Sequence, residues 1–288
     1  MTATALAQLG VDIHCEGVVH LYPSPEGDVV ALRGVDLDVE AGEALALLGP
    51  SGSGKSTMLA LLSGLLRPSA GRIRIGSNDL PRMSNRQLLR LRATDISLVL
   101  QDPARNLLPY ATAEQNIGFA QRGARGRKRN PPWSPLELLQ QLGMGTLAGQ
   151  TVSTLSGGEQ QRVAIAAGAS VRPTLLLVDE PTSQLDSGGR DQVISLLLKV
   201  NQELGATVIS VTHDPAVATA MPRTVSIRDG RIGAEGRRGE EYAVVGRDGS
   251  VQLPIDVLEW LPPGTLVQVH RHTQGVDLRS PDLEADDH

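Results

Sequence analysis

The chain has 288 residues, of which 40% are hydrophobic and 20% charged, and its formal net charge is -5. This is the composition of a globular protein with one large or two smaller domains, and its acidic balance argues against nucleic acid as the main partner. A single cysteine, Cys15, excludes an internal disulfide framework and fits a reducing cytoplasm. The N-terminus has no basic signal-peptide start, and no apolar run approaches the roughly 18 residues of a membrane span, so we expect any membrane-embedded part to belong to another chain.

Taken in chain order, the expected elements alternate between apolar strands and helices. Half-buried strands show an alternation of apolar and polar residues, and buried strands show unbroken apolar runs. These patterns predict strands at 11–22, 29–39, 44–48, 72–75, 96–100, 175–178 and 207–211, and helices at 55–66 and over most of 112–150, which a basic stretch at 122–132 interrupts. This order predicts an α/β fold whose mostly parallel sheet is covered on both faces.

The character of the sequence changes near residue 239. Alternating residues surround Asp248-Gly249 within 243–253, which predicts a hairpin. Residues 255–261 suit two helical turns before Pro262, and 267–279 form a second hairpin pattern. We therefore expect a first domain over 1–238, a small hairpin–helix–hairpin domain over 239–281 and a disordered acidic tail over 282–288.

A glycine-rich loop, GPSGSGKST, lies between the expected strand at 44–48 and the expected helix that follows. It fits the phosphate-binding pattern G-x-x-x-x-G-K-[ST], in which backbone N–H groups and a helix N-terminus hold phosphates. We expect Lys55 to reach the β- and γ-phosphates and Ser56 to offer its hydroxyl to Mg²⁺. The nucleotide-binding residues expected in this loop are Gly49, Ser51, Gly52, Ser53, Gly54, Lys55, Ser56 and Thr57.

Two further segments carry chemistry that suits a nucleotide. In LLLVDEP, Asp179 ends an apolar strand, where it is placed to hold the metal shell, and Glu180 follows it to orient or deprotonate a water. In LSGGEQQR, a serine and two glycines open a helix whose bare backbone amides favour an anion. The chain therefore has two phosphate-binding helix N-termini about a hundred residues apart.

Together with VTHD, these motifs resemble, in this order, the ATPase subunit of an ATP-binding cassette (ABC) transporter, over about residues 10–235. The resemblance implies a P-loop NTPase core with an antiparallel β subdomain, a helical subdomain at about 84–168, and ATP and Mg²⁺ as cofactors. It also implies a homodimer whose two copies face head to tail. Ser156, Gly157 and Gly158 of one copy then cap the ATP that the phosphate loop of the other copy holds.

The resemblance assigns roles to single positions of this sequence. Tyr22 matches the aromatic residue that stacks on adenine, and His213 the residue that contacts the γ-phosphate. Gln101 in LQDP matches the Q-loop, which touches the metal and faces the membrane partner, and Asp186 in SQLD matches the D-loop. The implied catalytic set is Glu180, His213, Gln101 and Asp186, and the implied metal set is Ser56, Gln101 and Asp179. Gln184 and Ala167 depart from the residues common in the family, which are alanine and arginine.

We expect the chain to work on the inner face of the cell membrane, in the cytoplasm, where it drives a separate transmembrane permease. The segment DPARNLLPYATAEQNI resembles the lipoprotein-release, macrolide-export and cell-division subgroup, whose membrane partners transmit force. An amino-acid or other small-solute importer is the alternative. ABC proteins of DNA repair or chromosome structure are excluded by the missing coiled-coil or zinc-binding insertion, and two-cassette translation proteins by the single cassette.

The C-terminal region resembles the swapped-hairpin domain of transition-state regulators, which dimerises and in many cases binds DNA. Residues 240–288 hold ten acidic residues against three arginines, a balance that repels a phosphate backbone. We therefore expect this region to support dimerisation, and an ATP-sensing regulator that binds DNA is the weaker alternative.

Overall fold

The computed structural model describes residues 10–279 apart from 26, 124–132, 184, 238–239, 247–248 and 274. Its residues fall into two compact units, Met1–Tyr242 and Ala243–His288. Several expectations lie outside the described residues: most of the basic stretch at 122–132, Gln184, Asp248 and the acidic tail at 282–288. The domain boundary expected after residue 238 also falls there, and it stays a prediction.

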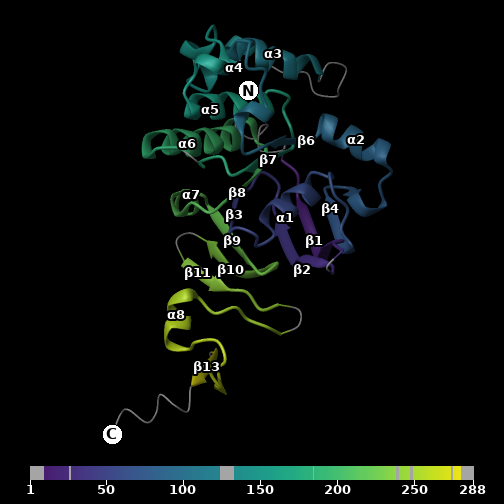
Figure 1. Ribbon diagram of the computed structural model, residues 1–288, viewed down its shortest axis with the longest axis vertical. Coiled ribbons are helices and arrows are strands. Elements are labelled where there is room, and N and C mark those ends of the chain that lie inside the picture. The colour runs from purple at the N-terminus through teal and green to yellow at the C-terminus, as the bar shows by residue number, and fades with distance from the viewer. Residues whose placement is uncertain are drawn as a thin grey trace. The chain divides into compact units, whose positions relative to one another are not determined.

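A seven-stranded sheet forms the centre of the first unit, in the order β11-β10-β9-β3-β8-β7-β6 (Figure 1). Its strands are β3 (Ala44–Leu48), β6 (Ile96–Val99), β7 (Leu175–Asp179), β8 (Thr207–Thr212), β9 (Arg223–Arg228), β10 (Arg231–Arg237) and β11 (Glu240–Ala243). The pairs from β6 through β7, β8 and β3 to β9 are parallel, and β9 and β10 are antiparallel. Helices cover both faces of such a sheet, so β3, β7 and β8 are buried along almost their whole length.

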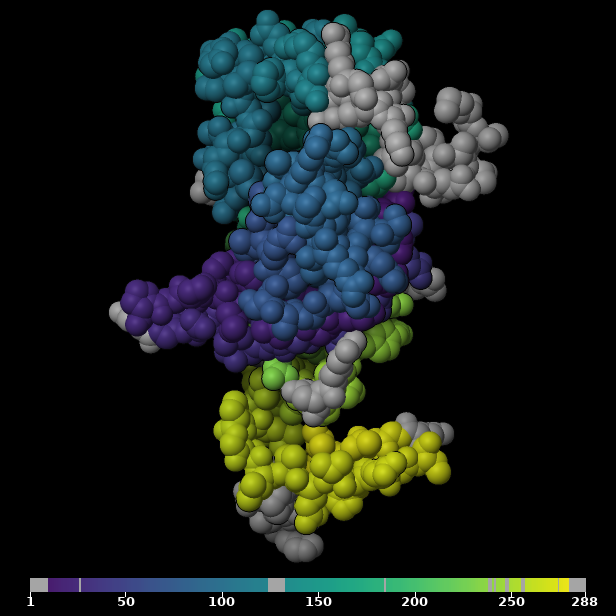
Figure 2. All heavy atoms as spheres, turned by 90° about the vertical axis from the view of Figure 1, so that its right-hand side faces the viewer, coloured from purple at the N-terminus to yellow at the C-terminus, as the bar shows by residue number. Residues whose placement is uncertain are grey.

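A second sheet has the order β2-β1-β4-β5 and is antiparallel. Its strands are β1 (Ile13–Tyr22), β2 (Val29–Val39), β4 (Ala70–Ile75) and β5 (Asn78–Asp79). One face is buried through Ile13, Val18, Leu32 and Ile73, which belong to the same apolar cluster as Leu47 of β3. In the view of Figure 2, the purple strands β1 and β2 lie next to the blue segment that carries β4 and α2.

Most of the helices belong to a second apolar cluster of the first unit. The helices are α1 (Lys55–Leu62), α2 (Asn85–Thr94), α3 (Ala113–Gly123), α4 (Pro135–Gln141), α5 (Gly157–Ala169), α6 (Ser187–Leu204) and α7 (Pro215–Ala220). Short 3-10 turns occupy Leu80–Arg82, Pro103–Arg105, Gly145–Leu147 and Val152–Thr154. Figure 1 shows α3, α4, α5 and α6 gathered beyond the edge of the main sheet formed by β6 and β7.

One predicted helix is shorter than expected. The pattern predicted 55–66, but α1 ends at Leu62. Gly64 then takes a left-handed φ of 67°, and the backbone N–H groups of Leu65 and Leu66 both donate to the carbonyl of Ala60. This is a glycine stop at a helix C-terminus, and it leaves Leu65 54% exposed.

A buried arginine connects strands that are far apart in the sequence. Arg223 of β9 is 7% exposed, and it donates to Glu235 of β10 at 2.9 Å and to Glu43, just before β3, at 3.2 Å. A third bond, of 2.6 Å, reaches the carbonyl of Asp38 in β2. These bonds satisfy a buried charge, and they tie the antiparallel sheet to the main sheet.

The second unit contains α8 (Ile255–Trp260) and the antiparallel pair β12 (Gln268–His272) and β13 (Gly275–Arg279). A bridge between Val245 and Val251 marks the first hairpin pattern. Leaving aside residues 255 and 256, no described side chain of this unit is buried, because so short a segment closes little core of its own. Over the described part of the chain, no helix combines the length and apolarity that a bilayer crossing requires.

Candidate nucleotide-binding site

The loop between β3 and α1 depends on glycine at defined positions. Gly49, Gly52 and Gly54 have φ values of 151°, 79° and 104°. A Cβ at Gly54 would lie 2.6 Å from the carbonyl oxygen of Ala31, and one at Gly49 would lie 2.1 Å from that of Ile227. Gly52 faces open space, so the backbone there stays accessible to a ligand. The loop is thus packed on its inner side and open on its outer side.

Two polar side chains of this loop are buried. Lys55 is 6% exposed, and its Nζ donates to the carbonyls of Gly49 and Pro50 at 2.7 and 2.9 Å. The hydroxyl of Ser53 is buried and has no hydrogen-bond partner among the described residues. A buried hydroxyl without a partner is costly, and a phosphate oxygen is a group that would satisfy it. The loop therefore fits a phosphate ligand.

Asp179 and Ser56 come together from different elements. Asp179 ends β7, Ser56 lies in the first turn of α1, and the serine hydroxyl donates to Oδ1 of the aspartate at 3.4 Å. Burial raises the pKa of Asp179, and the charge of Glu180 raises it further. A bound cation would relieve this penalty. Hydroxyl and carboxylate oxygens are the donors that Mg²⁺ prefers, so these residues fit the metal that the sequence implies.

The sequence-predicted metal set is brought together only in part. Gln101 follows β6, and its Nε2 donates to Ser183 at 3.3 Å, not to the Ser56–Asp179 pair. Among the described residues there is no cluster of three His, Cys, Asp or Glu side chains. A metal would therefore be held by one carboxylate with hydroxyl, amide and phosphate oxygens, which is how Mg²⁺ is commonly bound beside a nucleotide.

Glu180 and His213 meet because they follow neighbouring strands. Asp179 of β7 pairs with Val211 of β8, so the residues after these strands share one edge of the sheet. The Oε2 of Glu180 lies 2.8 Å from Nδ1 of His213, and its Oε1 lies 4.0 Å from Nζ of Lys55. The side chain of Glu180 is 13% exposed, so its carboxylate stands at the edge of solvent between two cationic or polar groups.

Tyr22 lies at the end of β1 beside the phosphate-loop helix. Its hydroxyl is 3.2 Å from Oγ1 of Thr57, and the residue is 39% exposed. His20, two residues earlier on the same face of β1, packs edge-on against the Tyr22 ring with centroids 4.7 Å apart. Sequence reasoning missed His20, although the i, i+2 spacing in a strand indicates that the two rings are neighbours.

The second helix N-terminus, at α5, is closed by its own residues. Ser156 is the N-cap: its Oγ accepts from the backbone N–H of Glu159 at 3.4 Å and donates to the Glu159 carboxylate at 2.7 Å. The hydroxyl bond to this carboxylate, and a second bond to it from the backbone N–H of Ser156 at 2.9 Å, hold the pKa of Glu159 below its usual value. Gly157 faces open space, whereas Gly158 packs near Gly189. The capping box explains the serine and the glutamate of LSGGE by local helix chemistry.

Asp186 is the N-cap of α6. Its side chain accepts from the backbone N–H of Gly189 at 2.8 Å, which orders the turn between Glu180 and the helix. Ser183 lies in that turn, and the sequence analysis did not select it. A hydroxyl three residues after Glu180, placed to bond back to the backbone, was the signal available in the sequence.

Residues 32–183 match the family model described as ABC transporter. The chain belongs to this family. The cassette is 44% identical over 207 residues to the lipoprotein-releasing system ATP-binding protein LolD of Anaeromyxobacter dehalogenans, which covers 71% of this chain and 85% of that protein. It is 35% identical over 271 residues to the energy-coupling factor transporter ATP-binding protein EcfA1 of Symbiobacterium thermophilum, covering 92% of this chain and 91% of that protein.

Solved ABC cassettes have the same fold. The dimeric post-hydrolysis structure of the cassette MJ0796, bound to ADP and Pi, superposes with a TM-score of 0.68 at 34% identity, covering 78% of this chain and 98% of that one. The predicted family and the predicted α/β fold class are confirmed. The protein is an ABC ATPase, and the family binds ATP.

Proposed function

We propose that this cassette is the ATP-hydrolysing subunit of an ABC transporter, and that two copies enclose two Mg·ATP and drive a separate transmembrane permease. The observation that carries the proposal is the position of the Glu180 carboxylate, beside Lys55 of the phosphate loop and His213 of the neighbouring strand. A base at this place adjoins the phosphates that the loop would hold. The comparison with a dimeric cassette bound to ADP and Pi supports the same arrangement.

Each predicted residue then has a chemical task. Tyr22 stacks on the base, and the loop amides with Ser53 and Lys55 hold the phosphates. Mg²⁺ would be held by Ser56, Asp179 and Gln101, and when bound it neutralises phosphate charge.

Hydrolysis needs a base and a group that orients it. Glu180 takes a proton from the attacking water, and His213, 2.8 Å away, orients the carboxylate and reaches the γ-phosphate. Asp186 orders the turn that follows Glu180. This assigns the proton transfer to one carboxylate.

The second helix N-terminus serves the other copy. Ser156, Gly157 and Gly158 stand at the start of α5, where the partial positive charge of the helix favours a phosphate. In a head-to-tail pair these donors cap the ATP held by the partner's loop. ATP then joins the two cassettes, and its hydrolysis releases them, which converts a chemical step into a domain motion.

The finer assignment is to the force-transmitting type of partner. The NLLP segment and the 44% identity to a lipoprotein-releasing ATPase favour it. The alternative, a small-solute importer, is favoured by the match to EcfA1, which covers 92% of this chain. The C-terminal unit, Ala243–His288, is longer than the 8% of the chain that this match leaves uncovered, so the match extends into that unit. In both cases we place the chain in the cytoplasm, on the inner face of the membrane.

One experiment separates these assignments. The full chain is purified and its ATPase activity is measured alone and after co-expression with the membrane protein encoded next to it. A four-span partner with a large outer domain that raises the ATPase rate supports the force-transmitting type, and a partner that works with a solute-binding protein supports import. A chain that binds ATP but hydrolyses none, alone or with that membrane protein, contradicts the proposed function.

A further inference from the structure

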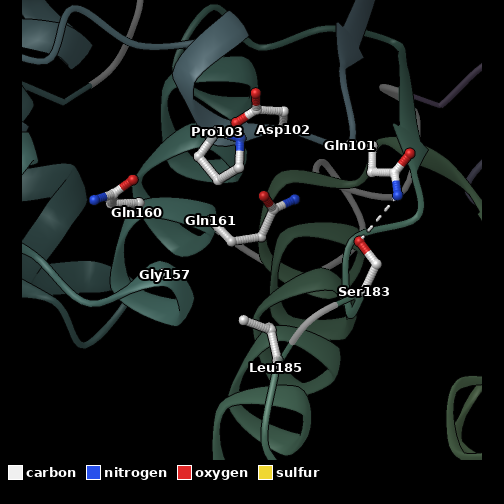
Figure 3. Close-up of a pocket in the computed structure, with 8 residues that line it drawn as sticks. All are labelled: Gln101, Asp102, Pro103, Gly157, Gln160, Gln161, Ser183 and Leu185. Carbon is white, nitrogen blue, oxygen red and sulfur yellow. Dashed lines mark hydrogen bonds between the residues drawn. The ribbon is translucent and has the colours of Figure 1, made fainter.

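A cavity of about 510 Å³ lies beside the Glu180 turn (Figure 3). Three segments form it: the residues after β6, the first turns of α5 and the turn after β7. The lining residues are Gln101, Asp102, Pro103, Gly157, Gln160, Gln161, Ser183 and Leu185. The cavity thus separates the Q-loop from the helix N-terminus that serves the partner's nucleotide, and Ser183 stands in its wall.

A chain of hydrogen bonds runs along that wall to Glu180. Nε2 of Gln101 donates to Oγ of Ser183 at 3.3 Å, and the same hydroxyl donates to the carbonyl oxygen of Glu180 at 3.0 Å. In Figure 3 the nitrogen end of the Gln101 amide faces Ser183, and its oxygen end points away. Ser183 therefore selects which end of the amide is free to accept or to bind a metal.

Glu180 needs such support because its backbone is strained. Its φ of 44° is a left-handed conformation that residues other than glycine seldom adopt. The N–H of Glu180 donates to the carbonyl of Val211 at 2.8 Å, and its carbonyl accepts from both the backbone N–H and the hydroxyl of Ser183, at 3.2 and 3.0 Å. A strained residue keeps its conformation only when its neighbours hold it, and Ser183 provides two of these bonds.

We propose that Ser183 is a positioning residue that links Gln101 to Glu180. Its hydroxyl aims the carbonyl end of the Gln101 amide toward the metal position, and it holds the backbone that presents the Glu180 carboxylate. The two groups are then oriented together, although they follow different strands. The inference rests on the proposed function, because it concerns the orientation of the same site.

The test compares the full-length chain with Ser183→Ala, Ser183→Thr, Gln101→Ala and the Ser183→Ala/Gln101→Ala double variant. We expect Ser183→Ala to lower kcat about tenfold and to raise the Mg²⁺ concentration for half-maximal rate several-fold, with the KM for ATP and the Tm unchanged. Ser183→Thr keeps the hydroxyl and restores both values. Because the two residues share one link, the loss in the double variant is smaller than the product of the two single losses.

A matched control and a binding measurement complete the test. Ser170 makes the same kind of bond, from its hydroxyl to the carbonyl three residues earlier at 2.7 Å, at the far end of α5, so Ser170→Ala leaves kcat and the Mg²⁺ requirement unchanged. The second readout is the rise in Tm on adding Mg²⁺ to the ATP-bound chain, which Ser183→Ala reduces and Ser183→Thr keeps.

Three results would overturn the inference. The first is a Ser183→Ala chain with unchanged kcat and Mg²⁺ dependence, and the second is a kcat loss in the double variant equal to the product of the two single losses. The third is a kcat loss in Ser183→Ala that accompanies a lower Tm and that Ser183→Thr does not restore. A wild-type chain without ATPase activity contradicts the proposed function instead. In that case the Mg²⁺-dependent Tm rise still decides the role of Ser183, since it reports binding and not turnover.

Discussion

Replacing Glu180 by glutamine removes one negative charge from the site and keeps the size of the side chain. In the wild-type chain the Glu180 carboxylate lies 2.8 Å from Nδ1 of His213 and 4.0 Å from Nζ of Lys55. Loss of a general base lowers the rate by roughly a hundredfold to ten-thousandfold. This equals about 3–5 kcal/mol of transition-state stabilisation. Glutamine has the same shape and stays polar beside His213, so we expect the free energy of unfolding to change by less than about 1 kcal/mol.

The Glu180→Gln chain should bind ATP and accumulate as an ATP-bound dimer, because binding no longer leads to hydrolysis. Phosphate release measures the rate, and size-exclusion chromatography with and without ATP measures the dimer. The control is Asp191→Asn, which changes a carboxylate that is 71% exposed on α6 and should leave both results as in the wild type. Turnover of Glu180→Gln within threefold of the wild type would refute the assignment, since another group would then handle the water.

Three further predictions concern the shared site, the metal position and the C-terminal unit. Lys55→Ala and Ser156→Arg should each abolish ATPase activity. Mixing the two variants should recover up to about a quarter of the wild-type rate, because half of the random dimers are mixed and each mixed dimer has one intact site of its two. No recovery in demonstrated heterodimers contradicts this prediction. Burial raises the pKa of Asp179, so its ionised form destabilises the fold above that pKa and the penalty fades as the pH falls through it. Asp179→Asn should therefore raise the Tm at neutral pH in EDTA, by an amount that shrinks in acid, and an unchanged or lower Tm refutes the argument. In the C-terminal unit Trp260 is 74% exposed, and we expect two copies of the unit to bury this side chain together. The full chain should then be a dimer without ATP, and a chain cut after Ala243, which keeps β11, should be a monomer. A monomeric full chain at micromolar concentration counts against this expectation.

The motifs and the main strands could be read from the sequence because their signals are local. A phosphate loop needs glycines at fixed spacing, and a strand buried on both faces shows an unbroken apolar run, as Ala44–Leu48 does. The hydrophobic period also predicted α8 and the hairpin of β12 and β13 within one residue or two. Where a single residue decides the outcome, as Gly64 does at the end of α1, the period alone extended the helix too far.

Only the tertiary structure placed distant groups against one another. The bond from Gln101 to Ser183 joins residues 82 positions apart, and that from Arg223 to the carbonyl of Asp38 joins residues 185 positions apart. No periodicity records such pairs, because they depend on which strands become neighbours in the sheet. The left-handed backbone of Glu180 has the same origin: its local sequence disfavours that conformation, and the bonds to Val211 and Ser183 impose it once β7 and β8 are paired. Local chemistry therefore determined which residues are available to the site, and the packing of the sheet decided how they are oriented.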